Sequence, residues 1–361
     1  MAKNTKNNSA VKKLKLTSRE KIFILVIVLL VAALVTVLAL DGLPANLFPK
    51  NEKVNYSFLS GESTISLPQE FDINTLLEVH FIDVGQGDAV LIRLPDGKDI
   101  LIDSGSGTSV SNANRTKHLE YLESMNLGEI DYMIVTHPDS DHINMLSSIL
   151  MAYEVKNIYY NNINGVHSQT YTRFLDDAEN EGATLFAIDD DGDIWTIDGG
   201  SYGYKLTVIA PGHERFEDTN AMSVICLLEY GGVEALFMGD ATSESEQWYM
   251  DNFDEPDIEI LKVGHHGSPT SSSLAFLQSV DPEYAVISAG KGNSYKHPDP
   301  EIMTRLFDEG IVTYRTDRHG TVILYIDADG DYGFLPEKDV MTENNTNNIP
   351  DRKLSATPAA A

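Results

Sequence analysis

The chain has 361 residues, of which 42% are hydrophobic and 22% charged, a composition typical of a globular protein with a large core. Its 55 acidic residues outnumber 26 basic ones and give a formal net charge of -29, so the bulk of its surface repels polyanions. The part of the chain after residue 41 shows no basic patch. This excludes a broad nucleic-acid-binding face and leaves such contact to a local feature or to bound metal ions.

The N-terminal region combines a basic flank with an apolar segment. Residues 1–21 contain seven Lys or Arg and one Glu, and the uncharged residues 22–40 follow. A helix of this length spans about 28 Å, close to the hydrocarbon thickness of a bilayer. We therefore predict a single-pass transmembrane helix in the cell membrane, with the basic flank cytoplasmic and the rest of the chain extracytoplasmic. Small residues at 37 and 39 leave a cleaved signal peptide, and hence secretion, as the alternative. Residues 41–75 are expected to be a linker.

Short apolar runs separated by Gly, Pro and Asp predict strands from residue 76 onward. Runs at 78–84, 88–94 and 98–104 predict an antiparallel meander, after which helical stretches near 115–126, 143–152 and 170–181 alternate with strands. The second half repeats this order, so we predict an α/β fold, a four-layer αββα sandwich over residues 76–335. The single cysteine, Cys226, lies in an apolar run and is expected to be buried. Residues 336–361 are predicted to be a disordered tail.

The densest group of potential metal ligands follows the apolar run 132–135. It contains His137, Asp139, Asp141 and His142. Another candidate, Asp240 in FMGDAT, also stands just past an apolar run. Neighbouring side chains on an extended loop diverge, so we predict two divalent ions rather than one. His137 and Asp139 would face one ion. Asp141 and His142 would face the other, with Asp240 as the bridge.

Two adjacent histidines in KVGHHGS, His265 and His266, are expected to supply a further ligand. The sequence does not decide which of them binds metal. We favour His265 as the ligand and His266 as a substrate contact or a supporting group. Lys262, which precedes them, is interpreted as an ordinary edge cation.

Several strings together resemble a known family. THPDSDH resembles the signature loop H-x-H-x-D-H of the metallo-β-lactamase fold, with Asp139 in the position of the second histidine. With FIDVGQGDAVLIRLPDGKDILIDSG, FMGDA, LKVGHHGS, SYKHP and YRTDRHG, residues 78–326 resemble the soluble domain of the ComEC/Rec2 DNA-uptake proteins. The resemblance implies a two-metal hydrolase, and in those relatives the domain is proposed to degrade one DNA strand during import. They also carry a many-helix channel, whereas we predict one membrane helix here and therefore expect no channel role.

The resemblance also implies roles for residues outside the ligand cluster. In the family the hairpin DVGQGD lies beside the metals, so supporting or substrate-contacting groups are expected at Asp83, Gln86, Asp88 and, in LIDSG, Asp103. Asp83 and Asp103 could instead simply cap strand ends. His297 matches a family histidine near the site, and a histidine can protonate a leaving oxygen or bind a phosphate. The catalytic candidates are therefore Asp141, His266 and His297.

The chain departs from the family pattern at two points. Asp139 replaces a soft imidazole by a hard carboxylate, which shifts the metal preference from Zn²⁺ toward Mn²⁺ or Mg²⁺. The histidine usually found between the loop and Asp240 is missing, and Asn220 and Ser223 occupy that region instead. His213 lies nearby and is interpreted as a solvated loop histidine.

These features favour a membrane-anchored, extracytoplasmic hydrolase with two divalent ions, Zn²⁺ or Mn²⁺. It would act as a phosphodiesterase or nuclease in competence-type DNA processing, with nucleic acid bound locally at the metal site. The net charge of -29 keeps another phosphodiester, such as a cell-wall polymer or a small metabolite, as an alternative. The missing family histidine keeps a second alternative, a degenerate binding protein without catalysis. No protein partner can be inferred from the sequence.

Overall fold

The computed structural model describes residues 72–105, 112–163, 168–188, 193–211, 216–253 and 258–338. The predicted membrane helix at 22–40, residues 41–71 of the predicted linker, His213 and residues 339–361 of the predicted tail lie outside them. None of the helices within the described residues is long and apolar enough to cross a bilayer.

Two β-sheets form the centre of the described part of the chain. The first sheet has the strand order β15-β14-β1-β2-β3-β4-β5-β6, and the second has the order β13-β12-β11-β10-β9-β8-β7. The first contains β1 (Leu77–Phe81), β2 (Val90–Arg93), β3 (Asp99–Ile102), β4 (Ile130–Val135), β5 (Val155–Asn161), β6 (Thr184–Ile188), β14 (Val322–Ile326) and β15 (Tyr332–Pro336). The second contains β7 (Ile194–Asp198), β8 (Lys205–Ile209), β9 (Ile225–Tyr230), β10 (Val233–Phe237), β11 (Ile260–Lys262), β12 (Tyr284–Ile287) and β13 (Val312–Arg315).

Each sheet is part antiparallel and part parallel. Strands β1, β2 and β3 form the predicted antiparallel meander, and β3 to β6 run parallel, with Ile102 opposite Ile134. In the second sheet β7 to β10 are antiparallel and β10 to β13 are parallel. Strand β14 belongs to the second half of the chain, but it pairs with β1 of the first sheet. The sheets therefore do not divide at the midpoint of the sequence, and β7 and β15 were not predicted.

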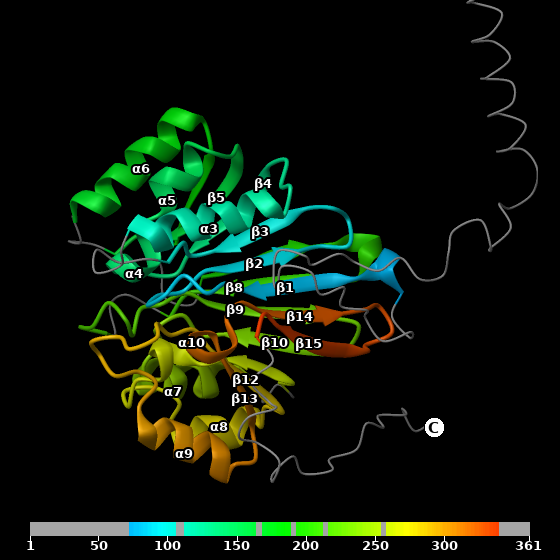
Figure 1. Cartoon of the computed structure of the whole chain (residues 1–361), viewed down its shortest axis with the longest axis vertical. Coiled ribbons are helices and arrows are strands. Elements are labelled where there is room, and N and C mark those ends of the chain that lie inside the picture. The colour runs from blue at the N-terminus through cyan, green and yellow to red at the C-terminus, as the bar shows by residue number, and fades with distance from the viewer. Residues whose placement is uncertain are drawn as a thin grey trace, which may run out of the picture. The chain divides into compact units, whose positions relative to one another are not determined.

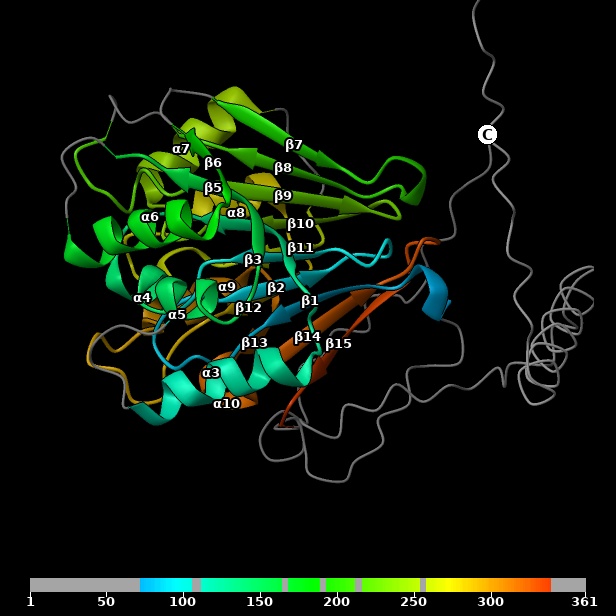
Figure 2. The ribbon, with the colours of Figure 1, turned by 90° about the horizontal axis from the view of Figure 1, so that it is seen from above.

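The sheets pack face to face around one core, and helices cover their outer faces. Phe81 of the first sheet and Phe237 of the second stack across the core with ring centroids 6.0 Å apart. Cys226 is buried in the same core, as predicted. Figures 1 and 2 show α3 (Asn112–Ser124), α5 (Leu146–Leu150) and α6 (Gln169–Glu181) over the first sheet. The second is covered by α7 (Ser243–Asn252), α8 (Leu274–Val280) and α9 (Pro300–Asp308). This arrangement confirms the predicted αββα layers.

Shorter helices connect the layers. They are α4 (Ser140–Ile143), α10 (Thr316–His319) and the 3-10 turns η1 (Ile73–Thr75), η2 (Gly200–Tyr202) and η3 (Gly264–Gly267). Strands β3, β4, β10, β11 and β12 all end, and the antiparallel β2 and β9 begin, at the same edge of the sandwich. Because polar side chains follow these strand ends, the topology brings them together from both sheets.

Candidate metal centre

The carboxylate of Asp240 lies at the centre of the site. It follows β10, and the residue is only 3% exposed. The Nε2 atoms of four histidines surround it, at 3.3 Å for His142, 3.4 Å for His266 and 3.8 Å each for His137 and His265. His137 and His142 come from the loop after β4 and from α4, whereas the other two lie in η3 after β11. Both sheets therefore contribute to one cluster.

The buried charges of the cluster compensate one another. Burial would raise the pKa of Asp240, but the neighbouring His266 and His142 hold it well below its usual range. Burial would also lower the pKa of those two histidines, and the charge of Asp240 raises both well above the usual value. Burial and the nearby charge of His142 lower the pKa of His137 to about 3, so this imidazole is neutral and free to act as a ligand.

Two more carboxylates approach the cluster from α4 and its N-cap. The Oδ2 atom of Asp141 lies 3.3 Å from Nε2 of His266, and its side chain is 22% exposed. Burial opposes its ionisation, but the adjacent His266 and the charge of His142 lower the pKa of Asp141 to about 2. The Asp139 side chain is 46% exposed, and its Oδ2 atom lies 3.9 Å from Nε2 of His137. Asp141 thus lies at the open side of the site, and Asp139 at its outer margin.

The donor atoms fall into groups that suit divalent cations. Within the part of the chain that the structure describes, four sets of three residues have donor atoms within 4.8 Å of one another. They are His137 with His142 and Asp240; Asp141 with His142 and His266; Asp88 with Asp240 and His266; and Asp88 with Asp103 and His142. Ligands held at about 2 Å from one ion lie roughly 3 to 4 Å apart, which is the spacing around Asp240. The predicted pairing of His137 with Asp139 is not among these sets, and His142 stands in its place.

Unpartnered buried atoms give an independent test of whether these residues fit a metal. The Nε2 atoms of His137, His142 and His266 and the Oδ1 atom of Asp240 are buried and have no hydrogen-bond partner. A buried polar atom without a partner costs about 1–3 kcal/mol, and here four such atoms face one space. Coordination of a divalent cation would satisfy them together. The residues therefore fit a metal centre.

Hydrogen bonds at the opposite ring nitrogens fix how the first two histidines face the centre. The Nδ1 atom of His142 lies 2.7 Å from Oδ2 of Asp103, which is fully buried after β3. The hydroxyl of Thr136 donates to the same carboxylate oxygen at 2.6 Å. The Thr136 oxygen can therefore accept a hydrogen bond from Nδ1 of His137, which lies 3.1 Å away. A carboxylate only accepts, so both Nδ1 atoms carry the proton and both Nε2 atoms face Asp240. Asp103 therefore orients ligands and does more than cap a strand.

The sequence did not decide between His265 and His266 and favoured His265 as the ligand, whereas the geometry favours His266. Its Nδ1 donates to the carbonyl of Ser288 at 3.0 Å, and its Nε2 faces both Asp240 and Asp141. His265 belongs to none of the donor groups found among the described residues. Its side chain is 22% exposed, and its Nδ1 is 3.0 Å from the hydroxyl of Thr270. The two histidines have φ of 48° and 54°, a left-handed conformation that is unfavourable for residues other than glycine. This turn aims two neighbouring rings at one site.

A model of the metallo-β-lactamase superfamily matches residues 82–291, a span that contains every donor named above. The chain belongs to the metallo-β-lactamase superfamily. Among curated proteins it resembles ComE operon protein 3 of Bacillus subtilis, with 30% identity over 75% of this chain and 36% of that protein. Recombination protein 2 of Haemophilus influenzae is 31% identical over 63% of this chain and 26% of that protein. Competence protein ComA of Neisseria gonorrhoeae is 30% identical over 66% and 31%, respectively. The chain thus matches about a third of the length of these relatives.

The DVGQGD hairpin lies against the ligand loop of this superfamily site. The amide of Asp88 donates to the carbonyl of Asp141 at 3.3 Å, and a Cβ on Gly87 would lie 2.2 Å from that oxygen. Only glycine permits this approach, which explains the second glycine of the motif. Gln86 accepts a hydrogen bond from the amide of Gly290. The Asp83 carboxylate accepts a hydrogen bond from the amide of Gly85 within the turn.

Three other predicted residues lie around the ligands in different ways. Ser223 is fully buried, and its hydroxyl accepts the amide of Asp240 at 3.2 Å. Asn220 accepts the amide of Ser223 through its main-chain carbonyl, so both shape the turn beside Asp240. The ring of His297 lies 5.9 Å from that of His265, at the outer rim of the site. The His297 Nδ1 atom is buried without a hydrogen-bond partner.

Lys262 is not the edge cation that the sequence indicated. It is 1% exposed, and its Nζ lies 2.8 Å from Oδ2 of Asp88. Because side chains alternate along a strand, Lys262 shares the inward face of β11 with the core residue Ile260. Burial would raise the pKa of Asp88, but Lys262 and His266 keep it far below its usual range. The Oδ1 atom of Asp88 is 3.2 Å from Nδ1 of His266. Lys262 therefore holds an ionised carboxylate behind a ligand histidine.

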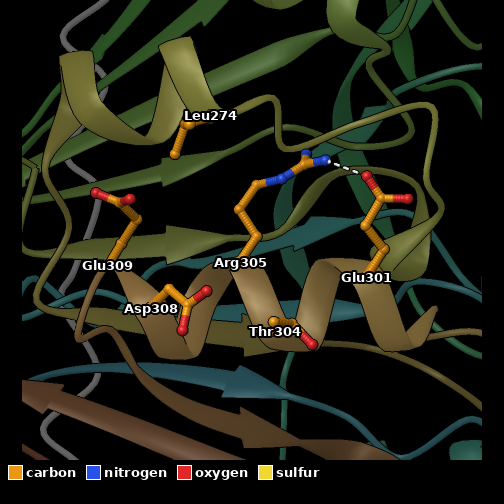
Figure 3. Close-up of a pocket in the computed structure, with 6 residues that line it drawn as sticks. All are labelled: Leu274, Glu301, Thr304, Arg305, Asp308 and Glu309. Carbon is orange, nitrogen blue, oxygen red and sulfur yellow. Dashed lines mark hydrogen bonds and ion pairs between the residues drawn. The ribbon is translucent and has the colours of Figure 1, made fainter.

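Arg305 of α9 braces the turn that follows the two adjacent histidines. Its guanidinium donates to the main-chain carbonyl of Ser272 and pairs with Glu301 at 2.9 Å (Figure 3). The hydroxyl of Ser271 donates to the carbonyl of Gly264 at 2.7 Å. The pocket drawn in Figure 3 lies beside this brace between α8 and α9, and none of its lining residues belongs to the donor groups. The contacts of Arg305 therefore support the turn after the two histidines.

We predict that Lys262→Met lowers the free energy of unfolding by about 3–5 kcal/mol, because it leaves Asp88 buried without its cation. Urea denaturation in the presence of a chelator measures this loss independently of metal binding. The matched control is Lys98→Met, which removes a 41% exposed lysine paired with Asp96 and should cost at most about 1 kcal/mol. Adding Asp88→Asn to Lys262→Met should recover part of the loss. Equal effects of the two lysine variants would refute a structural role for the buried pair.

Proposed function

We propose that the protein is a metal-dependent phosphodiesterase that cleaves nucleic acid. The observation that carries this proposal is the buried Asp240 carboxylate, ringed by unpartnered histidine nitrogens at an open edge of the sandwich. Relatives whose names refer to competence and recombination support nucleic acid as the substrate class. Since the chain covers only part of those proteins, DNA uptake itself is part of the proposal.

Two divalent ions sharing Asp240 would use the donors best. One would lie with His137 and His142, and the other with Asp141 and His266. Bound ions supply Lewis acidity toward a phosphoryl oxygen and activate water at neutral pH. The chain's own part is to hold the donors rigidly. Asp103 fixes the ring of His142, and the carbonyl of Ser288 fixes the ring of His266.

The residues at the open side of the centre would contact the substrate. Asp141 is the partly exposed carboxylate among the proposed ligands, and it would also orient the attacking water by accepting its hydrogen bond. His297 stands at the rim, where it would bind a phosphate oxygen or protonate the leaving oxygen. Because Asp141 and His297 come from different sheets, a phosphodiester bound between them would be held from two sides.

The first test of this function uses Asp141→Asn and Asp240→Asn, each of which should abolish hydrolysis. The amide cannot replace a carboxylate ligand, and even the loss of a group that supports a ligand typically costs about 10-fold or more. Wild type should hydrolyse bis-p-nitrophenyl phosphate and DNA with Mn²⁺ or Zn²⁺. The control Asp308→Asn changes an exposed carboxylate on α9 and should retain wild-type kcat. Either site variant with more than about a tenth of wild-type kcat would remove that residue from the centre.

Metal content separates this function from a degenerate binding site. The purified protein should hold metal, whereas a degenerate site would contain well under one ion per chain. We expect one ion to bind tightly and the second weakly. Beside His137, Asp139 offers a carboxylate oxygen, 3.9 Å from Nε2 of that histidine, in the position where the family has an imidazole, and an imidazole would favour Zn²⁺. After chelation, Mn²⁺ should restore activity better than Zn²⁺, and Asp139→His should reverse that order. Two Zn²⁺ ions retained through dialysis, with no gain from Mn²⁺, would contradict this reasoning.

The site of action follows from residues 1–40, which lie outside the described residues. We propose that 22–40 anchor the protein in the cell membrane and that the hydrolase domain lies outside the cytoplasm, because the basic flank precedes the apolar segment. A protease added to intact cells, freed of the outer wall where necessary, should remove the domain. A cytoplasmic protein should stay uncut in the same sample. Cleavage only after lysis would show that the topology is inverted.

A further inference from the structure

Residues 290–297, with the sequence GKGNSYKH, differ in charge from the rest of the chain. They contain two lysines, one tyrosine and one histidine and no acidic residue, in a chain with 55 acidic residues and 26 Lys or Arg. Lys291 and Lys296 are exposed, and Tyr295 is 64% exposed. We call this segment, which follows β12, the Tyr295 loop.

The Tyr295 loop connects solvent to the metal centre through a row of aromatic rings. The rings of Tyr295 and His297 lie nearly parallel, at 10°, with centroids 6.0 Å apart. His297 is 5.9 Å from His265, and His265 is 6.2 Å from His266. These separations lie within the range of aromatic contacts. An exposed aromatic face is thus placed a few ring widths from the ligands of the proposed ions.

Hydrogen bonds hold the Tyr295 loop in one conformation. The side-chain amide of Asn293 donates to the carbonyls of Gly290 and His297, and its oxygen accepts the amide of His297 at 3.0 Å. At its start, the amide of Gly290 donates to Gln86 of the DVGQGD hairpin at 3.1 Å. Just beyond its end, the amide of Asp299 donates to the carbonyl of Gly267 in η3. Tyr295 is therefore presented by a loop tied to the DVGQGD hairpin and to η3, which carries His266.

We propose that the Tyr295 loop binds single-stranded nucleic acid, with Tyr295 stacking on a base and Lys291 and Lys296 contacting phosphates on either side. This inference rests on the proposed phosphodiesterase function and narrows its substrate to a single strand. Stacking on a side chain requires an exposed base face, which a duplex does not offer. The lysines supply local attraction at the site in a protein whose net charge repels polyanions. Two lysines separated by four residues form no basic run, which is why the sequence indicated no patch.

An exposed tyrosine by itself is common on protein surfaces and needs no explanation. Tyr202 in η2 is 50% exposed and precedes β8, whose start is opposite the end of β9. It therefore lies at the end of the second sheet away from the metal ligands. Tyr295 differs because it stands beside two cations and in the ring row that reaches the centre. Tyr202 accordingly serves as the matched control.

The test compares a single-stranded oligonucleotide with one of equal length made of abasic sites, which keeps the phosphates and removes the bases. We would measure kcat/KM for full-length wild type and for three variants, Tyr295→Ala, Tyr295→Phe and Tyr202→Ala. Binding of each strand would be measured by fluorescence anisotropy in the presence of Ca²⁺. Tyr295→Ala should lose roughly 10-fold on the base-containing strand and far less on the abasic strand, since stacking is what the bases add. Tyr295→Phe should keep most of the wild-type preference, and Tyr202→Ala all of it.

The two lysines are tested by salt dependence. Lys291→Ala with Lys296→Ala should weaken binding of both strands and make the slope of log affinity against log salt shallower by about 1.4, or 0.7 for each phosphate contact. If Tyr295→Ala affects both strands equally, or affects neither, base stacking at this loop is refuted. If wild type hydrolyses no phosphodiester, including bis-p-nitrophenyl phosphate, the proposed function fails. The anisotropy measurements then still decide whether the loop binds a single strand.

Discussion

The buried carboxylate of Asp240 is the interaction on which the site depends. A charge held inside the sandwich is tolerated only where opposite charges surround it. Here histidines from the loop after β4 and from the turn after β11 approach its two oxygens, so one residue of the second sheet gathers ligands from both sheets. A divalent cation would satisfy the same carboxylate and the same nitrogens, so the folded donor set is suited to a metal centre.

The scaffold around Asp240 specifies orientation as well as proximity. Asp103 of the first sheet holds His142, and the carbonyl of Ser288 in the second sheet holds His266. The pair of Lys262 with Asp88 crosses between the sheets at the same edge. The two ring contacts lie within one sheet each, and the Lys262–Asp88 pair joins the sheets, as does the approach of His142 to Asp240. Displacing one sheet against the other would break both of the contacts that join them. The rigidity of the donor set therefore follows from the packing of the two sheets.

The sequence revealed the layers and the positions of the donors, because strand periodicity and polar residues at strand ends are local features. Its meander from 78 to 104 is found in the structure, and His137, Asp141 and His142 of the predicted cluster belong to the donor sets, whereas Asp139 does not. Other properties depend on distant partners. Which of His265 and His266 is the better placed metal ligand depends on a left-handed turn of the main chain, and the amino-acid sequence does not indicate the direction of that turn. Lys262 was misjudged because its partner Asp88 belongs to the other sheet, although a lysine within an otherwise apolar strand was a usable signal.

The charge of the protein has a consequence for how a polyanion would reach the centre. With a net charge of -29, long-range attraction is unavailable, so binding must come from short-range contacts at the site. Stacking on an aromatic ring is such a contact, since it does not require a positive surface. A loop with one exposed tyrosine and two lysines therefore suits an acidic protein better than a broad basic face would. The same acidity would disfavour duplex DNA, whose charge density is higher and whose bases are covered.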